Sequence, residues 1–517
     1  METKFHYGYS DCYIKCITFV PNLNVMSKPN YFIQKAILLL AFLISSFSTM
    51  NAQWTSPGNG TTYTLPDLVS VSNGVVTNTG NVFAFNADVT ISENDVLNID
   101  DQVTRIDAPG VLITIKGSMV CNNSETNRVK IYGTMTSQFS MRFENAVNCE
   151  LKHMYFSDGS GIKVIESEVT FDDVKFLYFT RDYANAVIDI FNCDPVIKNC
   201  YFQDNEGAAI SSPANGQSSP QILNNSLDAN VNGINSPQIN LGPGGEDTIR
   251  IIGNTIDDHW AQWHVGGISI ADLMGVGSTK VLMKDNIVKE GRYGYNQQGV
   301  TISSVIIGNQ FIDNFNEENP MNGGSGISIY GTTVNTKAIL RDNVITGNLW
   351  GITAIYLHDI DMGTEEDWGN NVIHDNYNNG TVYDLYNNST CDITAVGNSW
   401  GTTSEEMIEN HIVHQNDDPS LGLVTFIPFI GYDDINETKS SVFEILPNPV
   451  SNGLFNLILD EVIPSEVVIY NLNGQRVMSQ SIENKVNTIN VNALESGIYI
   501  IEVKNAEKTI VKRIVIK

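Results

Sequence analysis

Short apolar stretches alternate with polar turns along this chain, and between residues 146 and 400 the alternation becomes a repeat. One unit reads Ile-Arg-Ile-Ile-Gly-Asn-Thr-Ile-Asp over residues 249–257, then a variable loop, then Gly-Gly-Ile-Ser-Ile over residues 266–270. A landmark Asn stands a few residues ahead of an apolar side chain at Asn199, Asn224, Asn254, Asn286, Asn309, Asn343, Asn371 and Asn398. The copies lie 23 to 34 residues apart. This period predicts a solenoid, in which each unit buries its apolar side against its neighbours.

Each unit predicts two or three short strands that turn Ile, Val, Leu or Phe into the interior of a coil. We expect the landmark Asn at a sharp bend, because Asn tolerates left-handed backbone angles and its amide can bond to its stacked copy. The less regular apolar stretches at 82–85, 96–99, 111–115 and 129–132 predict the first coils, with residues 54–66 as part of an entry cap.

After the repeat, the sequence predicts an end cap and then a second domain. Residues 398–412 predict a helical cap, with Thr403 and Glu406 at capping-box spacing. The polar residues 433–442 predict a linker. From residue 443 on, six or seven short apolar stretches and an Asn-Gly turn at Asn473 predict a small antiparallel β-sandwich.

Two resemblances follow from these motifs. Over about residues 80–432 the repeat resembles the right-handed parallel β-helix of the pectate-lyase-like superfamily. The tail resembles the type A C-terminal sorting domain of type IX secretion substrates in the Bacteroidetes. The residues that carry this second resemblance are Pro447, Asn448, Pro449, Gly474, Gly497, Tyr499 and the terminal Lys517. It implies export by the type IX secretion machinery, followed by attachment to the outer-membrane surface or release.

The pattern near the N-terminus predicts a secretory signal peptide. An apolar run at 36–44 follows Lys28 and Lys35, and a cut after Ala52 is expected. Residues 1–25 fit no such pattern, which favours Met26 as the true start. The predicted parts are therefore a signal region at 1–52, an all-β parallel β-helix with end caps at 53–432, a linker at 433–442 and the sorting domain at 443–517. No transmembrane helix is expected in the mature chain.

The net charge of −29 is concentrated in residues 53–442, which hold 18 basic and 48 acidic residues. An acidic surface argues against nucleic acid as a partner. The five cysteines after residue 52 are scattered, which favours small buried side chains; a Cys193–Cys200 disulfide is the alternative. No metal or cofactor is expected. The acidic run 359–367 offers oxygen ligands for calcium, but its spacing does not fit an EF-hand, so a charged surface loop is preferred.

The variable loops after the landmark Asn all fall on one side of the predicted stack. They contribute aromatic rings, which we expect to line a glycan-binding groove because flat rings present apolar faces to sugars. The alternative is that the rings pack on their own loops. The candidate glycan-binding residues are Trp260, Trp263, Tyr293, Tyr295, Trp350 and Tyr377.

Weaker candidates for catalysis lie on the same loops. A lyase needs a cation beside the substrate carboxylate and a base, for which Lys289, Arg292, Tyr293 and His264 have suitable chemistry. A hydrolase needs two carboxylates, and Asp257, Asp258 and Asp313 are the nearest ones. Neither set matches a catalytic motif. The sequence therefore favours a glycan-binding or adhesive surface protein, with a polysaccharide lyase or glycoside hydrolase as the alternative.

Overall fold

The structure, a computed structural model, describes residues 53–100, 103–231, 236–258, 265–317, 319, 323–431, 443–459, 465–471, 475–504 and 509–517. The chain divides into two compact units, the first ending at Gly431. Several sequence predictions lie outside the described residues: the signal region, the linker, Trp260, Trp263, His264 and Gly474.

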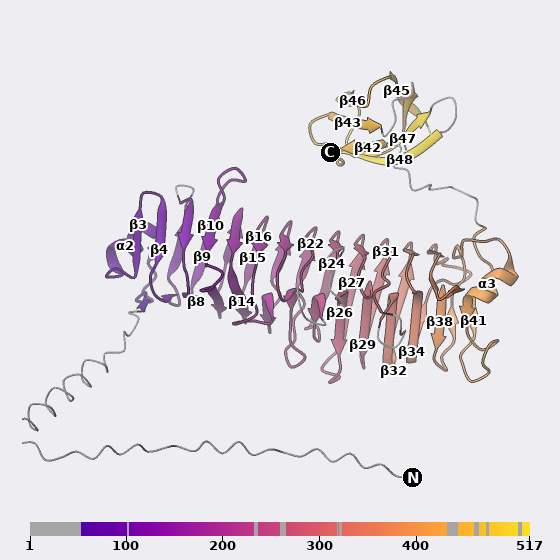
Figure 1. The fold of residues 1–517 in the computed structure, drawn as a ribbon, viewed down its shortest axis with the longest axis horizontal. Helices are drawn as coiled ribbons and strands as arrows, with labels where there is room; N and C mark the ends of the chain where they lie inside the picture. The colour runs from indigo at the N-terminus through magenta and orange to yellow at the C-terminus, as the bar shows by residue number, and fades with distance from the viewer. Residues whose placement is uncertain are drawn as a thin grey trace, which may run out of the picture. The chain divides into compact units, whose positions relative to one another are not determined.

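The first unit is a stack of parallel coils whose strands form three ladders, and the ladders run along the stack (Figure 1). The strands of the first ladder are β1 (Trp54–Thr55), β5 (Val89–Ile91), β8 (Leu112–Ile115), β11 (Phe139–Glu144), β14 (Gly159–Ile165), β17 (Ala186–Phe191), β20 (Ala208–Ser211), β23 (Pro237–Leu241), β26 (Gly266–Asp272), β29 (Tyr295–Gly299), the first part of β32 (Ser325–Arg341), the first part of β34 (Trp350–Asp361), β38 (Leu385–Asn388) and β40 (Ile412–Val413).

The second ladder shares the long strands β32 and β34 with the first, since both bend from one ladder into the next. Its other strands are β2 (Thr62–Tyr63), β6 (Val96–Ile99), β9 (Ser118–Asn122), β12 (Cys149–Lys152), β15 (Val169–Asp172), β18 (Val196–Lys198), β21 (Gln221–Leu223), β24 (Thr248–Ile252), β27 (Thr279–Lys284), β30 (Ile302–Ile307), β39 (Ile393–Thr394) and β41 (Val424–Thr425).

The third ladder is parallel except at its start, where β3 (Val76–Thr79) runs antiparallel to β4 (Val82–Phe85). The strands that follow are β7 (Arg105–Asp107), β10 (Val129–Tyr132), β13 (Met154–Ser157), β16 (Lys175–Leu177), β19 (Tyr201–Gln203), β22 (Ser226–Asp228), β25 (Thr255–Asp257), β28 (Ile287–Lys289), β31 (Gln310–Ile312), β33 (Val344–Thr346) and β35 (Val372–His374). This in-register stack confirms the predicted parallel β-helix.

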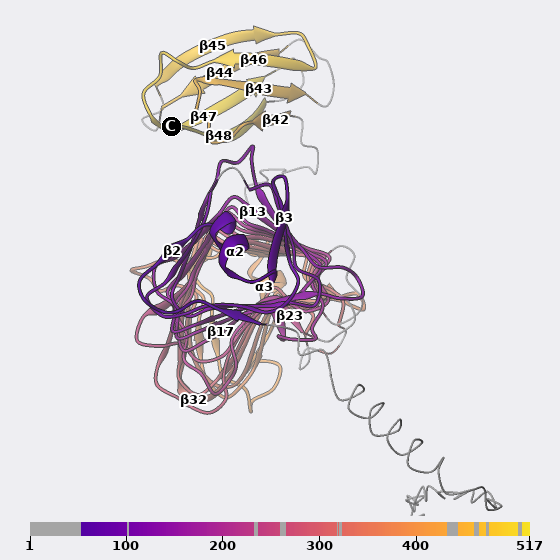
Figure 2. The ribbon, with the colours of Figure 1, turned by 90° about the vertical axis from the view of Figure 1, so that its left-hand side faces the viewer.

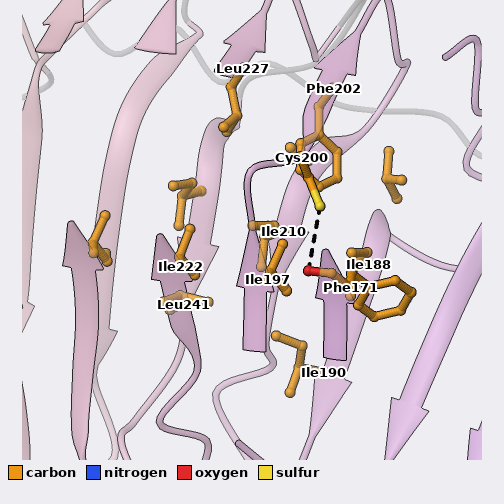
Figure 3. Packing of buried hydrophobic residues seen from close by; sticks show 14 of the residues in the cluster. Phe171, Ile188, Ile190, Ile197, Cys200, Phe202, Ile210, Ile222, Leu227 and Leu241 are labelled. Carbon is orange, nitrogen blue, oxygen red and sulfur yellow. Dashed lines mark hydrogen bonds between the residues drawn. The ribbon is translucent and has the colours of Figure 1, made fainter. Parts of the chain in front are cut away.

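The interior of the coils is an apolar core, because alternate residues of most strands point inward. Equivalent inward positions stack from coil to coil, as the close-up in Figure 3 shows for Ile188, Ile210 and their neighbours. On the third ladder the Phe156, Phe176 and Phe202 rings are stacked, with centroids 5.4 and 4.7 Å apart. The cysteines of the described residues are free, so the alternative Cys193–Cys200 disulfide is not formed.

The turn between the second and third ladders separates two roles that the sequence analysis gave to one Asn. The first turn residue takes the left-handed conformation, as at Asn199 (φ 56°) and Asn224 (φ 55°). The next residue is buried and carries the amide that bonds to the neighbouring coil. This amide ladder comprises Asn225, Asn254, Asn286, Asn309, Asn343, Asn371 and Asn398, with Nδ2 to Oδ1 distances of 2.8 to 3.0 Å. The assignments of Asn199 and Asn224 to the ladder were therefore wrong by one residue.

A second set of buried amides follows the third ladder, where the chain turns back toward the first. Asn314, Asn348 and Asn376 form one run, with Nδ2 to Oδ1 distances of 2.9 Å at each step. Asn205 and Asn230 form another. Between the two runs, Gly291 has no side chain, and the Asp258 Oδ2 lies 3.7 Å from the place that a Cβ on Gly291 would take. The second amide set is thus interrupted between Asn230 and Asn314.

Both ends of the stack are covered by short helices. At the start, α2 (Leu65–Val71) lies over the open end of the coil (Figure 2), with Thr64 and Asp67 as its capping box. At the far end, α3 (Glu405–His411) confirms the predicted cap helix, and Ile408 is its buried residue. Its N-cap is Ser404, whose Oγ accepts from the Met407 N–H at 3.3 Å, so the expected role of Thr403 was wrong.

The second unit consists of two small antiparallel sheets around one apolar core. One sheet contains β42 (Phe443–Leu446), β43 (Leu454–Leu459) and β46 (Val486–Asn490); the other contains β44 (Ser465–Tyr470), β45 (Arg476–Ile482), β47 (Gly497–Lys504) and β48 (Thr509–Ile516). Residues Pro447, Asn448 and Pro449 form the turn after β42. The Asn448 side chain accepts from the Val515 N–H at 2.9 Å, which ties this turn to the terminal strand. Gly497 pairs with Ile516, and the Tyr499 hydroxyl donates to the Glu495 carbonyl oxygen.

Candidate functional site

One outward-facing column of the first ladder is polar in every coil from β11 to β38. We call it the polar track. Its members are paired in register from one coil to the next: Arg142, Lys163, Asp189, Ser211, Asn240, Ser269, Asn296, Ser328, Thr353 and Tyr386. Most of these residues sit between two inward apolar residues, as Ser328 does between Ile327 and Ile329. Strand alternation therefore turns them outward.

A groove of about 280 Å³ lies over the middle of the polar track. Ser269, Asn296 and Ser328 form its floor, and Gln298 and Tyr330 lie beside them. The Asn296 Nδ2 donates to the Ser269 Oγ at 3.2 Å. The groove thus offers hydroxyl and amide groups at the spacing of successive strands, about 4.8 Å.

One wall of the groove comes from the residues just ahead of β29. Arg292 and Tyr293 line it, with the Arg292 guanidinium carbon 5.7 Å from the Tyr293 ring centroid, and Gly323, just ahead of β32, lies beside them. The Tyr293 ring is held against Gly266, where a side chain would collide with it. Burial raises the pKa of Tyr293 to about 12, so its hydroxyl stays protonated at neutral pH.

Aromatic residues other than those expected lie at the far side of the groove. Tyr330 lines it and packs edge-on against Tyr356, with ring centroids 5.0 Å apart. Tyr356 is 55 % exposed and has φ 59°, a conformation that a bulky residue rarely adopts. Further along the track, the Tyr383 and Tyr386 rings are 6.3 Å apart. In the sequence, the track corresponds to the polar residue between two apolar ones in the Gly-x-Ile strands, whereas the expected site residues were taken from the loops.

The structure places three of the expected groove aromatics elsewhere. Tyr295 points into the coil, where its hydroxyl lies 2.9 Å from Ser304 Oγ, so its ring is not available to a ligand on this face. Trp350 is buried against Tyr383, with centroids 6.1 Å apart. Tyr377 is 59 % exposed in the small hairpin of β36 (Tyr377–Asn378) and β37 (Thr381–Val382), apart from the groove lining. Among the candidate aromatics within the described residues, Tyr293 alone lines the groove.

The candidate catalytic residues are divided between two faces. Arg292 is at the groove, but Lys289 and Asp257 lie on the outward side of the third ladder, joined by a 2.6 Å ion pair. Asp258 is 2 % exposed, and among the described residues neither of its carboxyl oxygens has a hydrogen-bond partner. Burial, followed by repulsion from Asp257 and Glu290, raises its pKa to about 9. The geometry therefore does not bring these residues together as a catalytic set.

Three carboxylates of the acidic run 359–367 form ion pairs with basic side chains. Asp361 and Asp367 each lie 2.8 Å from the Arg341 Nη2, and Asp359 lies 2.7 Å from the Lys337 Nζ. Asp313 sits at a left-handed turn position. His374 pairs with Asp375 and His411 with Asp384. Across the described ranges, no three His, Cys, Asp or Glu side chains are grouped so that they could hold a metal ion.

Two family models match parts of the chain. Residues 444–517 match a family described as a secretion system C-terminal sorting domain. Residues 292–407 match a protein family of unknown function, DUF1565. Together with the in-register coils, these matches confirm both resemblances: the chain is a right-handed parallel β-helix protein that ends in a type IX sorting domain. The tail marks it for secretion to the cell surface or the medium.

Known relatives are distant. A funoran endo-beta-hydrolase of Wenyingzhuangia aestuarii is 26 % identical over 82 residues, which are 16 % of this chain and 11 % of that protein. A solved structure of a mutant of the periplasmic alginate epimerase AlgG is 12 % identical, with a TM-score of 0.44, over 71 % of this chain and 84 % of that one. A tailspike mutant of E. coli bacteriophage HK620 in complex with a pentasaccharide is 12 % identical, with a TM-score of 0.37, over 94 % and 88 %. At these levels of likeness, none of the three indicates what this chain does. Among the described helices, none is long and apolar enough to cross a membrane.

Proposed function

We propose that this chain is an exported β-helix protein that binds a polysaccharide along the polar track. The observation that carries the proposal is the in-register column of small hydroxyl and amide side chains under a groove of about 280 Å³. A chain of sugar units lying along the stack would meet equivalent groups on successive coils. Such a surface suits a repeating ligand better than a small compact one.

The groups around the track support a carbohydrate ligand. Ser269 and Ser328 are nearly buried and offer directional hydrogen bonds to hydroxyl groups. The Tyr330 and Tyr356 rings supply flat apolar surface with a polar edge, which suits the alternately apolar and polar faces of a sugar ring. The sorting tail supports a place of action outside the outer membrane, where polysaccharides occur.

The direct test is to fill the groove. Asn296→Trp replaces a floor residue with a ring that occupies much of the space, and we expect it to abolish binding in affinity electrophoresis against a polysaccharide panel. Gln310→Trp is the matched control, since Gln310 is exposed on the third ladder at β31. Equal binding by wild type and Asn296→Trp would exclude the groove as the binding site.

The same panel tests for catalysis. Each incubation is followed for unsaturated products by absorbance and for new reducing ends by chemical assay. We expect binding without turnover, because the candidate acid and base residues do not converge at the groove. If the wild type forms products and Asn296→Trp does not, the groove is an active site and the binding role is replaced by an enzymatic one.

A further inference from the structure

Two cations stand next to each other at the first end of the polar track. Arg142 on β11 and Lys163 on β14 are register partners, so their side chains leave the ladder side by side. Like charges on neighbouring strands repel each other, and the surrounding region has a balance of −30. The placement of two cations side by side on the polar track is therefore unfavourable unless another group compensates for their repulsion.

Neighbouring groups orient these cations without neutralising both of them. The Arg142 Nε lies 2.9 Å from a Glu144 carboxylate oxygen, which fixes the guanidinium. The Lys163 ammonium lies 4.5 Å from the centroid of the Tyr183 ring and makes no ion pair with any described residue. Its positive charge rests against an aromatic face rather than a carboxylate.

The carboxyl next to Lys163 on the track belongs to Asp189. Asp189, one coil further on, accepts a hydrogen bond from the Ser211 hydroxyl at 2.8 Å. Burial raises the pKa of Asp189, against the opposing effects of Ser211 and Lys163.

The loop that carries Tyr183 is built to hold this arrangement. The backbone N–H groups of Tyr183 and Ala184 both donate to the Ser160 carbonyl oxygen at 3.1 Å. Gly161 has φ 124°, and a side chain there would collide with Ala184. This close approach holds the Tyr183 ring beside Lys163, and the Arg142 guanidinium lies by the Tyr183 hydroxyl.

We propose that Arg142 and Lys163 form an anion-binding subsite, which recognises a carboxylate or sulfate group on the polysaccharide bound along the track. The anion sits between the guanidinium and the ammonium, and its charge offsets their mutual repulsion. The rest of the glycan continues over Ser211 and Asn240 toward the groove. This inference rests on the proposed binding function and narrows it to acidic glycans.

The experiment measures binding by titration calorimetry with two matched pairs of polysaccharides: alginate with its carboxyl-reduced form, and carrageenan with its desulfated form. We expect the wild-type chain to bind the charged member of at least one pair about tenfold more tightly. Which pair shows the difference separates a carboxylate from a sulfate. The preference should weaken as salt is added.

Lys163→Met removes the ammonium and keeps most of the side-chain length. It should reduce binding of the charged member about tenfold and leave the uncharged member nearly unchanged. Lys175→Met is the matched control, because Lys175 is exposed on β16 of the third ladder. Thermal unfolding of both variants verifies that the fold is retained.

The outcomes separate the two proposals. If the wild type binds both members of each pair equally and loses that binding in Asn296→Trp, the groove is confirmed and the anion subsite is refuted. If Lys163→Met behaves like Lys175→Met, the subsite is likewise refuted. Absence of binding to every polysaccharide of a broad panel would refute both the subsite and the binding function.

Discussion

The coils up to β19 and the coils from β22 onward make the same turn with different chemistry. In the earlier coils the buried turn position before the third ladder is apolar or a thiol: Met154, Val174 and Cys200. In the later coils the same position carries the amide ladder that starts at Asn225. Cys200 is the junction, since its N–H donates to the Asn225 Oδ1 at 2.8 Å.

The two regions differ in how strongly the buried residue at this turn depends on its counterpart in the next coil. In the amide ladder, each Asn from Asn225 to Asn371 donates to the next amide and to a carbonyl oxygen of the preceding coil, as Asn309 does to Asn343 and to Met283. Removing one member leaves several buried polar groups without partners. Truncating an apolar side chain at this turn removes only packing contacts. The later coils are therefore expected to be less tolerant of substitution at this turn.

The largest effect is expected at the centre of the amide ladder. Asn309→Val removes the acceptor for the Asn286 N–H and Nδ2, at 3.0 and 2.8 Å, and the donor to Met283. Each stranded buried group costs about 1–3 kcal/mol, so we expect the free energy of unfolding to fall by about 3–5 kcal/mol. Urea denaturation of the exported chain measures the loss.

The matched substitution in the earlier coils is Val174→Ala, which should cost about 1–3 kcal/mol because it removes packing alone. An equal or smaller loss for Asn309→Val than for Val174→Ala would contradict the contrast between the two regions.

A smaller effect, with a pH dependence, is expected where the second amide set is interrupted. The pKa of Asp258 is about 9 in the folded chain, against an ordinary value of 3.8. Between these values the folded state holds a proton that the unfolded state releases, so this group's contribution to stability is complete below about pH 4 and is lost as the pH rises toward 9. Asp258→Asn should therefore raise stability at pH 8, by at least about 1 kcal/mol.

Thermal unfolding at pH 8 and pH 4 tests this sign. The gain from Asp258→Asn should disappear at pH 4, where the wild-type carboxyl is protonated as well. Asp342→Asn is the control, because Asp342 is exposed at a left-handed turn position that Asn also accepts. A gain that is the same at both pH values, or a loss at pH 8, would show that Asp258 is not held neutral.

The smallest effect is expected at the junction between the regions. The Cys200 Sγ already lies 3.7 Å from the Phe171 carbonyl oxygen, the contact drawn in Figure 3. In Cys200→Asn, one amide hydrogen would reach Phe171 and the other the Asn225 Oδ1, so the ladder would extend by one coil. We expect a change in stability within about 1 kcal/mol. A loss of several kcal/mol would mean that the earlier coils cannot accommodate an amide.

The repeat could be predicted from the sequence because the buried Asn recurs at nearly every coil from Asn254 to Asn398. It was misplaced at Asn199 and Asn224, because Asn also favours the left-handed turn position one residue earlier and the two roles cannot be told apart without the backbone. The N-cap of α3 was missed by one residue for a similar reason: Thr403 and Ser404 both suit a cap.

The site was less predictable because strand parity depends on where each strand begins after a variable loop. Arg292 and Tyr293 line the groove, whereas Tyr295 begins β29 and points inward, with Asn296 outward. The number of residues from the landmark Asn does not show which of these side chains point inward and which point outward. The cationic end of the track was also hidden: Arg142 and Lys163 are 21 residues apart in sequence and become neighbours only through the register of β11 and β14.

The most direct test of the central claim is a crystal structure of the mature chain with a bound oligosaccharide from a polysaccharide that it binds. The account predicts sugar units lying along the stack over the first ladder, with hydrogen bonds to Ser269, Asn296 or Ser328 and an acidic group at Arg142 and Lys163. An oligosaccharide bound on the third ladder or at the turn between the first and second ladders, with the polar track uncovered, would contradict it.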